Sequence, residues 1–192
     1  WMLLNGNIST MVDHFFAGRS RPTIEYRTEL LVLEDGGTVG LDWAVSCDGV
    51  PTGTDACSPV VVVMHGLCGD SVSSSYIPHF AAGLHQQLKG WRMVCMNARG
   101  CGSLKLTTPQ GFTAAKFSDY AETLAHIRAS THARVELYGV GFSLGAGILA
   151  NYLGKTAAVN MPLKGAILIA PPWNFHCSTP WFDFWSRNIL VG

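Results

Sequence analysis

Residues 134–154 read RVELYGVGFSLGAGILANYLG, and this stretch decides the fold. Residues 134–138 are predicted to form a strand, and residues 143–153 a helix rich in small and apolar side chains. Between them, Gly141-Phe142-Ser143-Leu144-Gly145 matches the pattern G-x-S-x-G, a weak signal alone because this chain has 21 glycines. The flanking strand and helix make the match specific, because a sharp strand–turn–helix connection is the setting of a nucleophile elbow.

The glycines of this motif have a steric explanation. A sharp turn brings strand and helix so close that Gly141 and Gly145 have no room for a Cβ atom, while Ser143 adopts strained dihedral angles. The Ser143 hydroxyl is then expected above the sheet, over helix N-terminal amides that favour developing negative charge. The alternative is that Ser143 simply caps the helix, because serine is a preferred N-cap residue. The flanking elements and two further motifs favour the elbow.

The second motif, His65-Gly66-Leu67-Cys68-Gly69, directly follows an apolar run at residues 59–64. The run shows no alternation, which is typical of a parallel strand buried on both faces. The loop after it can aim a backbone N–H at the space above Ser143. We therefore predict that the backbone N–H groups of Leu67 and Leu144 form an oxyanion hole, in which one donor is typically worth about 2.7–4 kcal/mol.

The third motif, Asn97-Ala98-Arg99-Gly100-Cys101-Gly102-Ser103, follows a strand predicted at residues 91–96. A glycine-rich turn here lies at the carboxyl edge of the sheet, where ligands of α/β proteins bind. Arg99 is interpreted as a structural residue that ties loops together, with substrate contact as the weaker alternative. Cys101 could be a reactive thiol of lowered pKa, but the serine elbow makes that interpretation unnecessary.

The order of the predicted elements gives the fold class. Residues 28–34 and 38–45 form a hairpin closed by Asp35-Gly36-Gly37, and the second strand has the alternation of a half-buried strand, with Val39, Leu41, Trp43 and Val45 on its apolar face. Further strands are predicted at residues 59–64, 91–96, 134–138 and 164–170, and helices at 73–89, around 117–127 and at 143–153. This order predicts an α/β fold: a mostly parallel, twisted sheet with helices on both faces and an N-terminal antiparallel hairpin.

Composition narrows the classes of function. The 192 residues carry 13 basic and 13 acidic side chains, so the formal net charge is zero, and 48% of residues are hydrophobic. This excludes a disordered chain and argues against a nucleic-acid partner bound by a basic face. The six cysteines and seven histidines show no metal-ligand spacing, so no metal is expected, and cysteine usage favours a reduced, intracellular setting. No apolar run approaches the roughly 18 residues of a membrane span.

The three motifs stand in the sequence as HGLCGDSVSSSYI, NARGCGSLKLTTPQGF and GVGFSLGAGILANYLG. In that order they resemble the α/β-hydrolase superfamily and, more narrowly, the AB hydrolase type 4 family of abhydrolase-domain lipases and esterases. PTIEYRTELLVLEDGGTVGLDW and APPWNFHCS fit as well, so the resemblance covers about residues 5–180.

The resemblance implies hydrolysis of carboxylic esters, in acyl lipids or smaller esters, without a metal or organic cofactor. Ser143 would be the nucleophile, and the His65-Gly66-Leu67 loop would supply the oxyanion hole. Many relatives carry a single membrane anchor before the catalytic domain. The resemblance therefore also implies association of an intracellular protein with a membrane, through a segment upstream of this chain.

The general base and its orienting acid do not fit the pattern within this chain. A serine hydrolase of this fold has its triad in the chain order Ser, Asp or Glu, His. After Ser143 the only histidine is His176 and the only acid is Asp183, in reversed order and too near the serine. We therefore expect the base, the acid and the last two strands beyond Gly192. On this interpretation residues 1–25 are a lead-in, residues 26–192 are an incomplete, C-terminally truncated α/β-hydrolase domain, and the chain alone has little or no activity.

Three alternatives compete with ester hydrolysis. A dinucleotide-binding turn at residues 139–145 is rejected, because no Asp or Glu lies between Ser143 and Phe182 to bind a ribose. An acyltransferase would use the same elbow but pass the acyl group to an alcohol or thiol. A non-catalytic binding protein is the third, if this chain is the whole product.

The aromatic tail could line an acyl-chain pocket or lid, or be ordinary core or membrane-facing surface; it comprises Trp173, Trp181, Phe182, Phe184 and Trp185.

Overall fold

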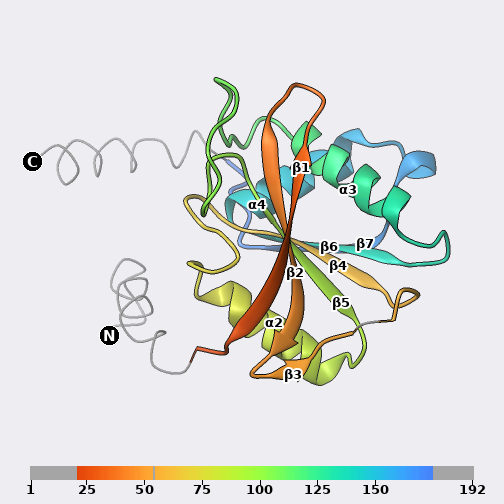
Figure 1. The fold of residues 1–192 in the computed structure, drawn as a ribbon. Helices are drawn as coiled ribbons and strands as arrows, with labels where there is room; N and C mark the ends of the chain where they lie inside the picture. Colours follow the sequence, from red (N-terminus) through yellow and green to blue (C-terminus); the bar gives the residue numbers. More distant parts are fainter. Residues whose placement is uncertain (1–20, 54, 175–192) are drawn as a thin grey trace, which may run out of the picture.

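The computed structural model describes residues 21–53 and 55–174. Most of the predicted lead-in therefore lies outside the described residues, as do His176, Asp183 and the aromatic tail beyond Trp173. The described strands form one sheet in the spatial order β1-β2-β5-β4-β6-β7, with β3 paired to β2 off this path. The strands are β1 (Ile24–Val32), β2 (Thr38–Cys47), β3 (Val50–Pro51), β4 (Val60–Met64), β5 (Arg92–Asn97), β6 (Leu137–Phe142) and β7 (Leu163–Ile169) (Figure 1).

The sheet begins with the predicted hairpin. β1 and β2 are antiparallel, with one bulge between Glu25 and Tyr26. In the connecting turn Gly36 takes a φ of +80°, a conformation that glycine adopts without strain. β1 begins at Ile24 rather than at Thr28, because backbone pairing with β2 extends beyond the apolar stretch. β2 is also antiparallel to β5, which joins the hairpin to the parallel part of the sheet.

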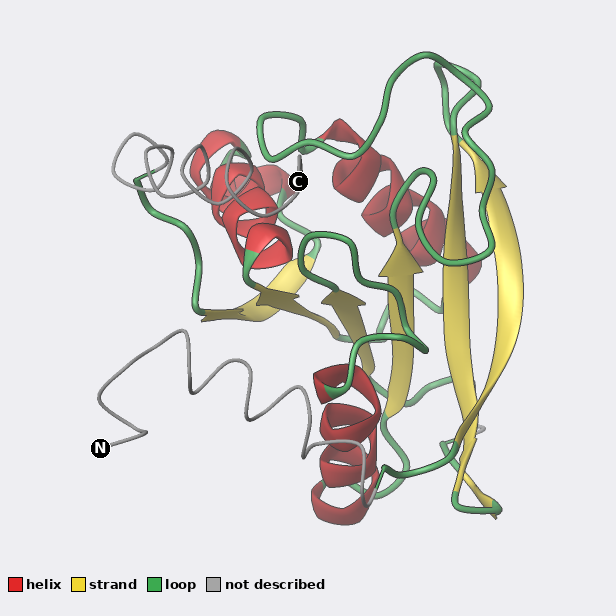
Figure 2. Ribbon diagram, turned by 90° about the vertical axis from the view of Figure 1, so that its left-hand side faces the viewer, coloured by secondary structure: helices red, strands yellow, loops and turns green. Residues whose placement is uncertain are grey.

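The parallel part consists of β5, β4, β6 and β7. All five residues of β4 are buried, because helices cover both faces of the sheet (Figure 2). On one face Val60 and Val62 share a core with α3 (Ser118–Ser130) and α4 (Leu144–Lys155). On the other face Val61 and Val63 share a core with α2 (Tyr76–Gln87). The predicted α/β architecture, with a mostly parallel sheet between two helical layers, is confirmed.

β6 lies further along the chain than the sequence predicts. It runs from Leu137 to Phe142, whereas the apolar pattern indicates a strand at residues 134–138. Glycine has a low strand propensity, which hides the continuation of the strand through Gly139. A Cβ atom at Gly139 would lie 2.9 Å from the Tyr120 hydroxyl oxygen, so the close approach of α3 requires glycine there.

Two other boundaries differ as well. α2 begins at Tyr76 rather than at Ser73, because Asp70 and Ser74 close a hydrogen-bonded turn ahead of it: the Asp70 N–H donates to Ser74 Oγ, and the Ser74 N–H donates to the Asp70 carbonyl. The short strand β3 lies within residues 46–59, which the sequence predicts to be a loop.

The parallel strands bring the three motifs to one edge of the sheet. β4, β5 and β6 point the same way, so the loops that begin at His65 and Ala98 and the turn at Ser143 all follow carboxyl ends. This is the edge at which α/β folds bind ligands.

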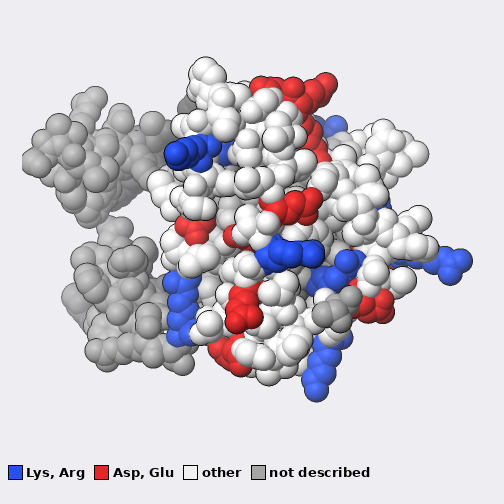
Figure 3. All heavy atoms as spheres, viewed as in Figure 1, with Lys and Arg blue, Asp and Glu red and all other residues white. Residues whose placement is uncertain are grey.

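The face of the molecule seen in Figure 3 carries basic and acidic side chains interspersed among uncharged ones, rather than gathered by sign. In the described ranges there is no helix with both the length and the apolar character needed to cross a membrane.

Candidate active site

Ser143 occupies a strained turn between β6 and α4. β6 ends at Phe142 and α4 begins at Leu144, so Ser143 alone makes the turn. Its φ is +50° and its ψ is −115°, a conformation that costs a non-glycine residue on the order of 1–3 kcal/mol. Two backbone bonds hold it: its N–H donates to the Ile169 carbonyl at 2.8 Å, and its carbonyl accepts from the Gly147 N–H at 3.1 Å. The side chain is exposed above the sheet edge.

The two glycines of the motif allow backbone segments to touch. A Cβ atom at Gly145 would lie 2.4 Å from the His65 carbonyl oxygen and 2.6 Å from that of Met64. A Cβ atom at Gly141 would lie 2.6 Å from the Ala146 Cα atom. The obstructing atoms are backbone and cannot rotate aside. The turn therefore has the steric requirement of a nucleophile elbow, with glycine on both sides of the serine.

The loop after β4 approaches the same serine through Gly66. A Cβ atom at Gly66 would lie 3.2 Å from Ser143 Cβ and 3.5 Å from the Phe142 carbonyl oxygen. The loop then turns, with the Gly69 N–H donating to the Gly66 carbonyl at 3.2 Å. Gly66 thus lets the loop backbone pass directly beside the elbow.

The buried side chain of His65 holds the first part of this loop by hydrogen bonds. It is fully buried, and its Nε2 accepts a hydrogen bond from the Ala98 N–H at 3.1 Å. Nε2 is therefore unprotonated, and Nδ1 carries the proton that it donates to the Gly66 carbonyl at 2.7 Å. Burial lowers the pKa of His65, which favours this neutral ring. The bond to the Gly66 carbonyl also orients the N–H of Leu67, because both belong to one planar peptide.

The two predicted oxyanion donors come from the first residue of α4 and from the loop after β4. Leu144 is the first residue of α4, so its N–H belongs to the turn of the helix that lacks intrahelical acceptors. Leu67 lies in the exposed part of the loop, directly after Gly66. The role of these two amides as an oxyanion hole stays a prediction.

Arg99 is a buried side chain in an ion-pair network that does not include Ser143. Its Nε and Nη2 atoms donate to the two carboxylate oxygens of Asp119 at 2.6 and 2.9 Å, and Nη2 also donates to Asp35 at 2.8 Å. Nη1 donates to Thr108 Oγ1 at 3.2 Å. A Cβ atom at Gly37 would lie 2.0 Å from Nη1, so glycine leaves room for the guanidinium. Arg99 thus joins the hairpin turn, the loop after β5 and α3, which is the loop-tying arrangement expected of it.

Asp42 also supports the loops at the carboxyl edge of the sheet, and the sequence alone did not indicate this role. The alternation in β2 predicts that Asp42 is exposed, but only 5% of its surface is accessible. The Ser71 hydroxyl and Asn97 Nδ2, the latter at 2.6 Å, both donate to its Oδ2 atom, while Thr28 Oγ1 donates to Oδ1 at 2.5 Å. The loop after β4 therefore covers this face of β2 through Ser71. No short-range signal in the sequence indicates it.

The cysteines of the described residues are free thiols, namely Cys47, Cys57, Cys68, Cys95 and Cys101. Burial raises the pKa of Cys101, so its interpretation as a thiol of lowered pKa is wrong. Across residues 21–53 and 55–174, no side chain hydrogen-bonds to the Ser143 hydroxyl, and no group of three or more metal-ligating side chains occurs.

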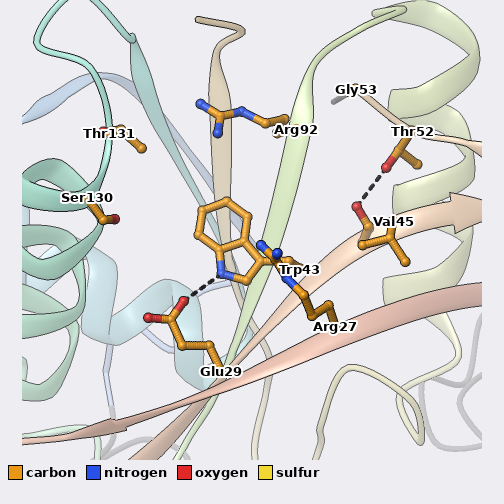
Figure 4. Close-up of a pocket in the computed structure, with 10 residues that line it drawn as sticks. Arg27, Glu29, Trp43, Val45, Thr52, Gly53, Arg92, Ser130 and Thr131 are labelled. Carbon is orange, nitrogen blue, oxygen red and sulfur yellow. Dashed lines mark hydrogen bonds between the residues drawn. The ribbon is translucent and has the colours of Figure 1, made fainter. Parts of the chain in front are cut away.

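A pocket of about 370 Å³ lies at the opposite edge of the sheet (Figure 4). Its lining includes Arg92, the first residue of β5, and Thr131, which follows α3. The Trp43 indole donates a hydrogen bond to Glu29 at 3.1 Å within it. Because it lies at the amino ends of the parallel strands, this pocket is separate from the candidate site around Ser143.

A strained serine between a central parallel strand and a helix, with a glycine loop beside it, defines the α/β-hydrolase class of fold. A family model described as alpha/beta hydrolase fold matches residues 59–189, and the chain belongs to this family. The resemblance of the sequence motifs to α/β hydrolases is thereby confirmed.

Curated relatives include hydrolases of lipids and esters. Embryogenesis-associated protein EMB8 of Picea glauca is 38% identical over 88% of this chain and 36% of the relative. Phospholipase ABHD3 of Homo sapiens is 34% identical over 83% of this chain and 38% of the relative. Medium-chain fatty acid ethyl ester synthase/esterase 2 of Saccharomyces cerevisiae is 37% identical over 69% of this chain and 29% of the relative. The chain thus spans well under half the length of these relatives.

Solved structures share the fold. The esterase Pf2001 of Pyrococcus furiosus superposes with a TM-score of 0.66 at 15% identity, over 85% of this chain and 59% of that one. The α/β hydrolase GrgF of Penicillium sp. sh18 superposes with a TM-score of 0.60 at 12% identity, over 85% of this chain and 53% of that one. At these identities the likeness shows the fold alone.

Proposed function

We propose that this chain holds the nucleophile and the oxyanion loop of a serine-dependent carboxylic ester hydrolase. The observation that carries the proposal is the φ of +50° at Ser143, in a turn where neither Gly141 nor Gly145 has room for a Cβ atom. Backbone strain of this kind persists only where the surroundings impose it, and it concentrates at functional sites. A serine that merely caps a helix takes extended dihedral angles and needs no such strain.

The proposed reaction has two halves. Ser143 Oγ bonds to the acyl carbonyl carbon while a histidine outside the described residues takes the hydroxyl proton. The carbonyl oxygen becomes an oxyanion that accepts hydrogen bonds from the Leu67 and Leu144 N–H groups. The tetrahedral intermediate then expels the alcohol, which receives the proton from the histidine. Water attacks the acyl-enzyme in the same way, releasing the acid and restoring Ser143.

Acyl lipids are the proposed substrates. Leu67, Val72, Leu106 and Trp173 are each more than half exposed, in segments that follow the carboxyl ends of β4, β5 and β7. Apolar side chains around the mouth of a site suit an acyl chain better than a charged substrate. Two similar proteins are named as a phospholipase and a monoacylglycerol lipase. Association with a membrane stays a prediction.

A fluorophosphonate probe tests the nucleophile. We expect covalent labelling of the full-length protein and none after the substitution Ser143→Ala. Labelling that survives Ser143→Ala would overturn the assignment, and an unlabelled wild type would favour a non-catalytic protein. For residues 1–192 alone we expect little turnover, because a serine without its base is a weak nucleophile. Robust esterase activity of that chain would place the base within it.

An acyltransferase is the second candidate, because one relative is named as both a synthase and an esterase of fatty acid ethyl esters. The two activities differ only in whether water or an alcohol attacks the acyl-enzyme. Product partitioning in the presence of ethanol separates them. Predominant formation of ethyl ester would favour the transferase, and predominant formation of free acid the hydrolase.

A further inference from the structure

Tyr76 is the first residue of α2, and its side chain touches both parts of the candidate active site. Its hydroxyl oxygen accepts a hydrogen bond from the Gly66 N–H at 2.9 Å. Its ring packs on the ring of Phe142, with centroids 4.7 Å apart and planes inclined by 35°. Gly66 belongs to the predicted oxyanion loop, and Phe142 directly precedes Ser143. One side chain therefore spans the loop and the elbow.

The hydroxyl of Tyr76 and the nucleophile border the same small space. The position where Gly66 would carry a Cβ atom lies 3.1 Å from the Tyr76 hydroxyl oxygen and 3.2 Å from Ser143 Cβ. Only glycine leaves this space open. A change in the position of the Tyr76 hydroxyl therefore acts on backbone that lies directly against Ser143.

Gly66 is held on both sides by side chains. The Tyr76 hydroxyl holds the peptide group between His65 and Gly66 by accepting from its N–H. The His65 ring holds the peptide group between Gly66 and Leu67 by donating to its carbonyl. Glycine has the widest range of backbone conformations, so a free Gly66 would let the Leu67 N–H point in many directions. With both peptides held, the direction of the Leu67 N–H is set relative to Ser143.

We propose that Tyr76 is a positioning residue that fixes the oxyanion loop against the nucleophile elbow. The inference rests on the proposed ester hydrolysis, in which the serine and the loop amide meet around one carbonyl carbon. Accurate placement of an oxyanion donor matters most when negative charge has developed on the carbonyl oxygen. Loss of the Tyr76 hydroxyl should therefore lower kcat and leave KM nearly unchanged.

The test compares Tyr76→Phe with Tyr138→Phe in the full-length protein. Tyr76→Phe keeps the ring on Phe142 and removes the acceptor of the Gly66 N–H. Tyr138→Phe is the matched control, because it removes a hydroxyl bonded to Glu136 at 2.8 Å while its ring stays stacked on Trp91, toward the amino end of β6. Rates are divided by the number of serines titrated with the fluorophosphonate, so unfolded protein does not contribute.

For Tyr76→Phe we expect kcat per titrated serine to fall about tenfold, with KM within about twofold of wild type. The inhibition constant of an alkyl boronic acid, whose serine adduct is tetrahedral, should rise by a similar factor. Tyr138→Phe should change neither. A merely structural role would lower the melting temperature and the number of titratable serines, but not kcat per titrated serine.

A kcat per titrated serine within twofold of wild type in Tyr76→Phe would overturn the positioning role, while labelling of Ser143 would leave the proposed function intact. A wild type that takes up no probe would overturn both. If Tyr76→Phe does not fold, Phe142→Leu removes the ring contact but keeps the hydroxyl. It should also lower kcat at unchanged KM, and a wild-type kcat there would equally overturn the inference.

Discussion

The loops that follow β4 and β5 lie side by side at one edge of the sheet but are held by different forces. The loop after β4 is held at Gly66, whose carbonyl accepts a hydrogen bond from the neutral ring of His65 and whose N–H donates one to the hydroxyl of Tyr76. The loop after β5 is held by Arg99, whose guanidinium is paired with Asp35 and Asp119.

The difference follows from the position of each loop. The loop after β4 passes close to the nucleophile at Gly66, where a Cβ atom would lie 3.2 Å from Ser143 Cβ. Hydrogen bonds with the uncharged His65 ring and Tyr76 hydroxyl orient the two peptide groups of Gly66. The loop after β5 meets the hairpin turn and α3 through the Arg99 guanidinium, which donates hydrogen bonds to Asp35 and Asp119. We therefore expect added side-chain bulk and acid to destabilise the arrangement around the loop after β4. We expect the removal of a charge to destabilise the arrangement around the loop after β5.

The largest effect is expected from Gly145→Ala. The new Cβ atom would lie 2.4 Å from the His65 carbonyl oxygen, so strand and helix would have to separate. We expect a loss of at least about 4 kcal/mol in the free energy of unfolding, measured by urea denaturation of the full-length protein.

Gly83→Ala in α2 is the matched control, because a Cβ atom there meets nothing within 4 Å. It should be neutral or stabilise the protein by up to about 1 kcal/mol, since alanine favours helix. Equal effects of the two substitutions would contradict the steric account of the elbow.

Arg99→Ala should have the next largest effect. It removes the bidentate partner of the largely buried Asp119 carboxylate, which keeps Lys116 Nζ at 3.5 Å, and it removes the link between the hairpin turn and α3. Breaking a buried pair from one side costs about 3–5 kcal/mol, and the remaining Lys116 should keep the loss near the lower end of that range. Urea denaturation measures the loss. A cost below about 1 kcal/mol would show that the network does not hold the loop.

The next largest effect should be a loss of stability in acid, and this loss should depend on His65. Its pKa is lowered in the folded protein by burial, so the unfolded chain binds the proton more readily. This contribution to stability is present above the unfolded pKa of about 6.5 and is lost as the pH falls below it. Between pH 7.5 and 5.5 the loss should reach up to about 1.4 kcal/mol.

The substitution His65→Gln should flatten this dependence, as measured by urea denaturation across the same pH range. The exposed His79 offers the matched substitution His79→Gln, against which the change in slope is compared. The ion pairs of Asp35 do not interfere, because the pKa of Asp35 lies well below its usual range beside Arg99. An unchanged slope in His65→Gln would contradict the neutral-ring assignment.

Lys164→Met should have the smallest effect. Lys164 pairs with Glu136 at 3.6 Å on the surface of the sheet, where water screens both charges. Exposed pairs contribute about 0–1 kcal/mol, so the midpoint of urea denaturation should barely move. A loss comparable to that of Arg99→Ala would show that burial does not distinguish the two ion pairs.

The fold and the elbow were accessible from sequence because their signals are local. The unalternating apolar residues of β4 mark a central strand, and the glycines around Ser143 mark a tight turn, within a few residues each. The partners of Arg99 were not accessible, because Asp35 lies 64 positions away and Asp119 lies 20.

The burial of Asp42 and the contacts of Tyr76 were missed for the same reason. Ser71 covers Asp42 from a loop 29 residues further along the chain. Tyr76 stands in a predicted helix, where nothing nearby shows that its hydroxyl reaches back to Gly66. The alternation in β2 also predicts that Val45 is buried, but it is 40% exposed, because no helix side chain of the described cores packs on it.

The central claim is that Ser143 is the nucleophile, and site mapping tests it most directly. The full-length protein is treated with a fluorophosphonate and digested, and the modified residue is located by tandem mass spectrometry. The account predicts an adduct on Ser143, formed in the native protein and absent after denaturation. An adduct on another serine, with Ser143 unmodified, would contradict it.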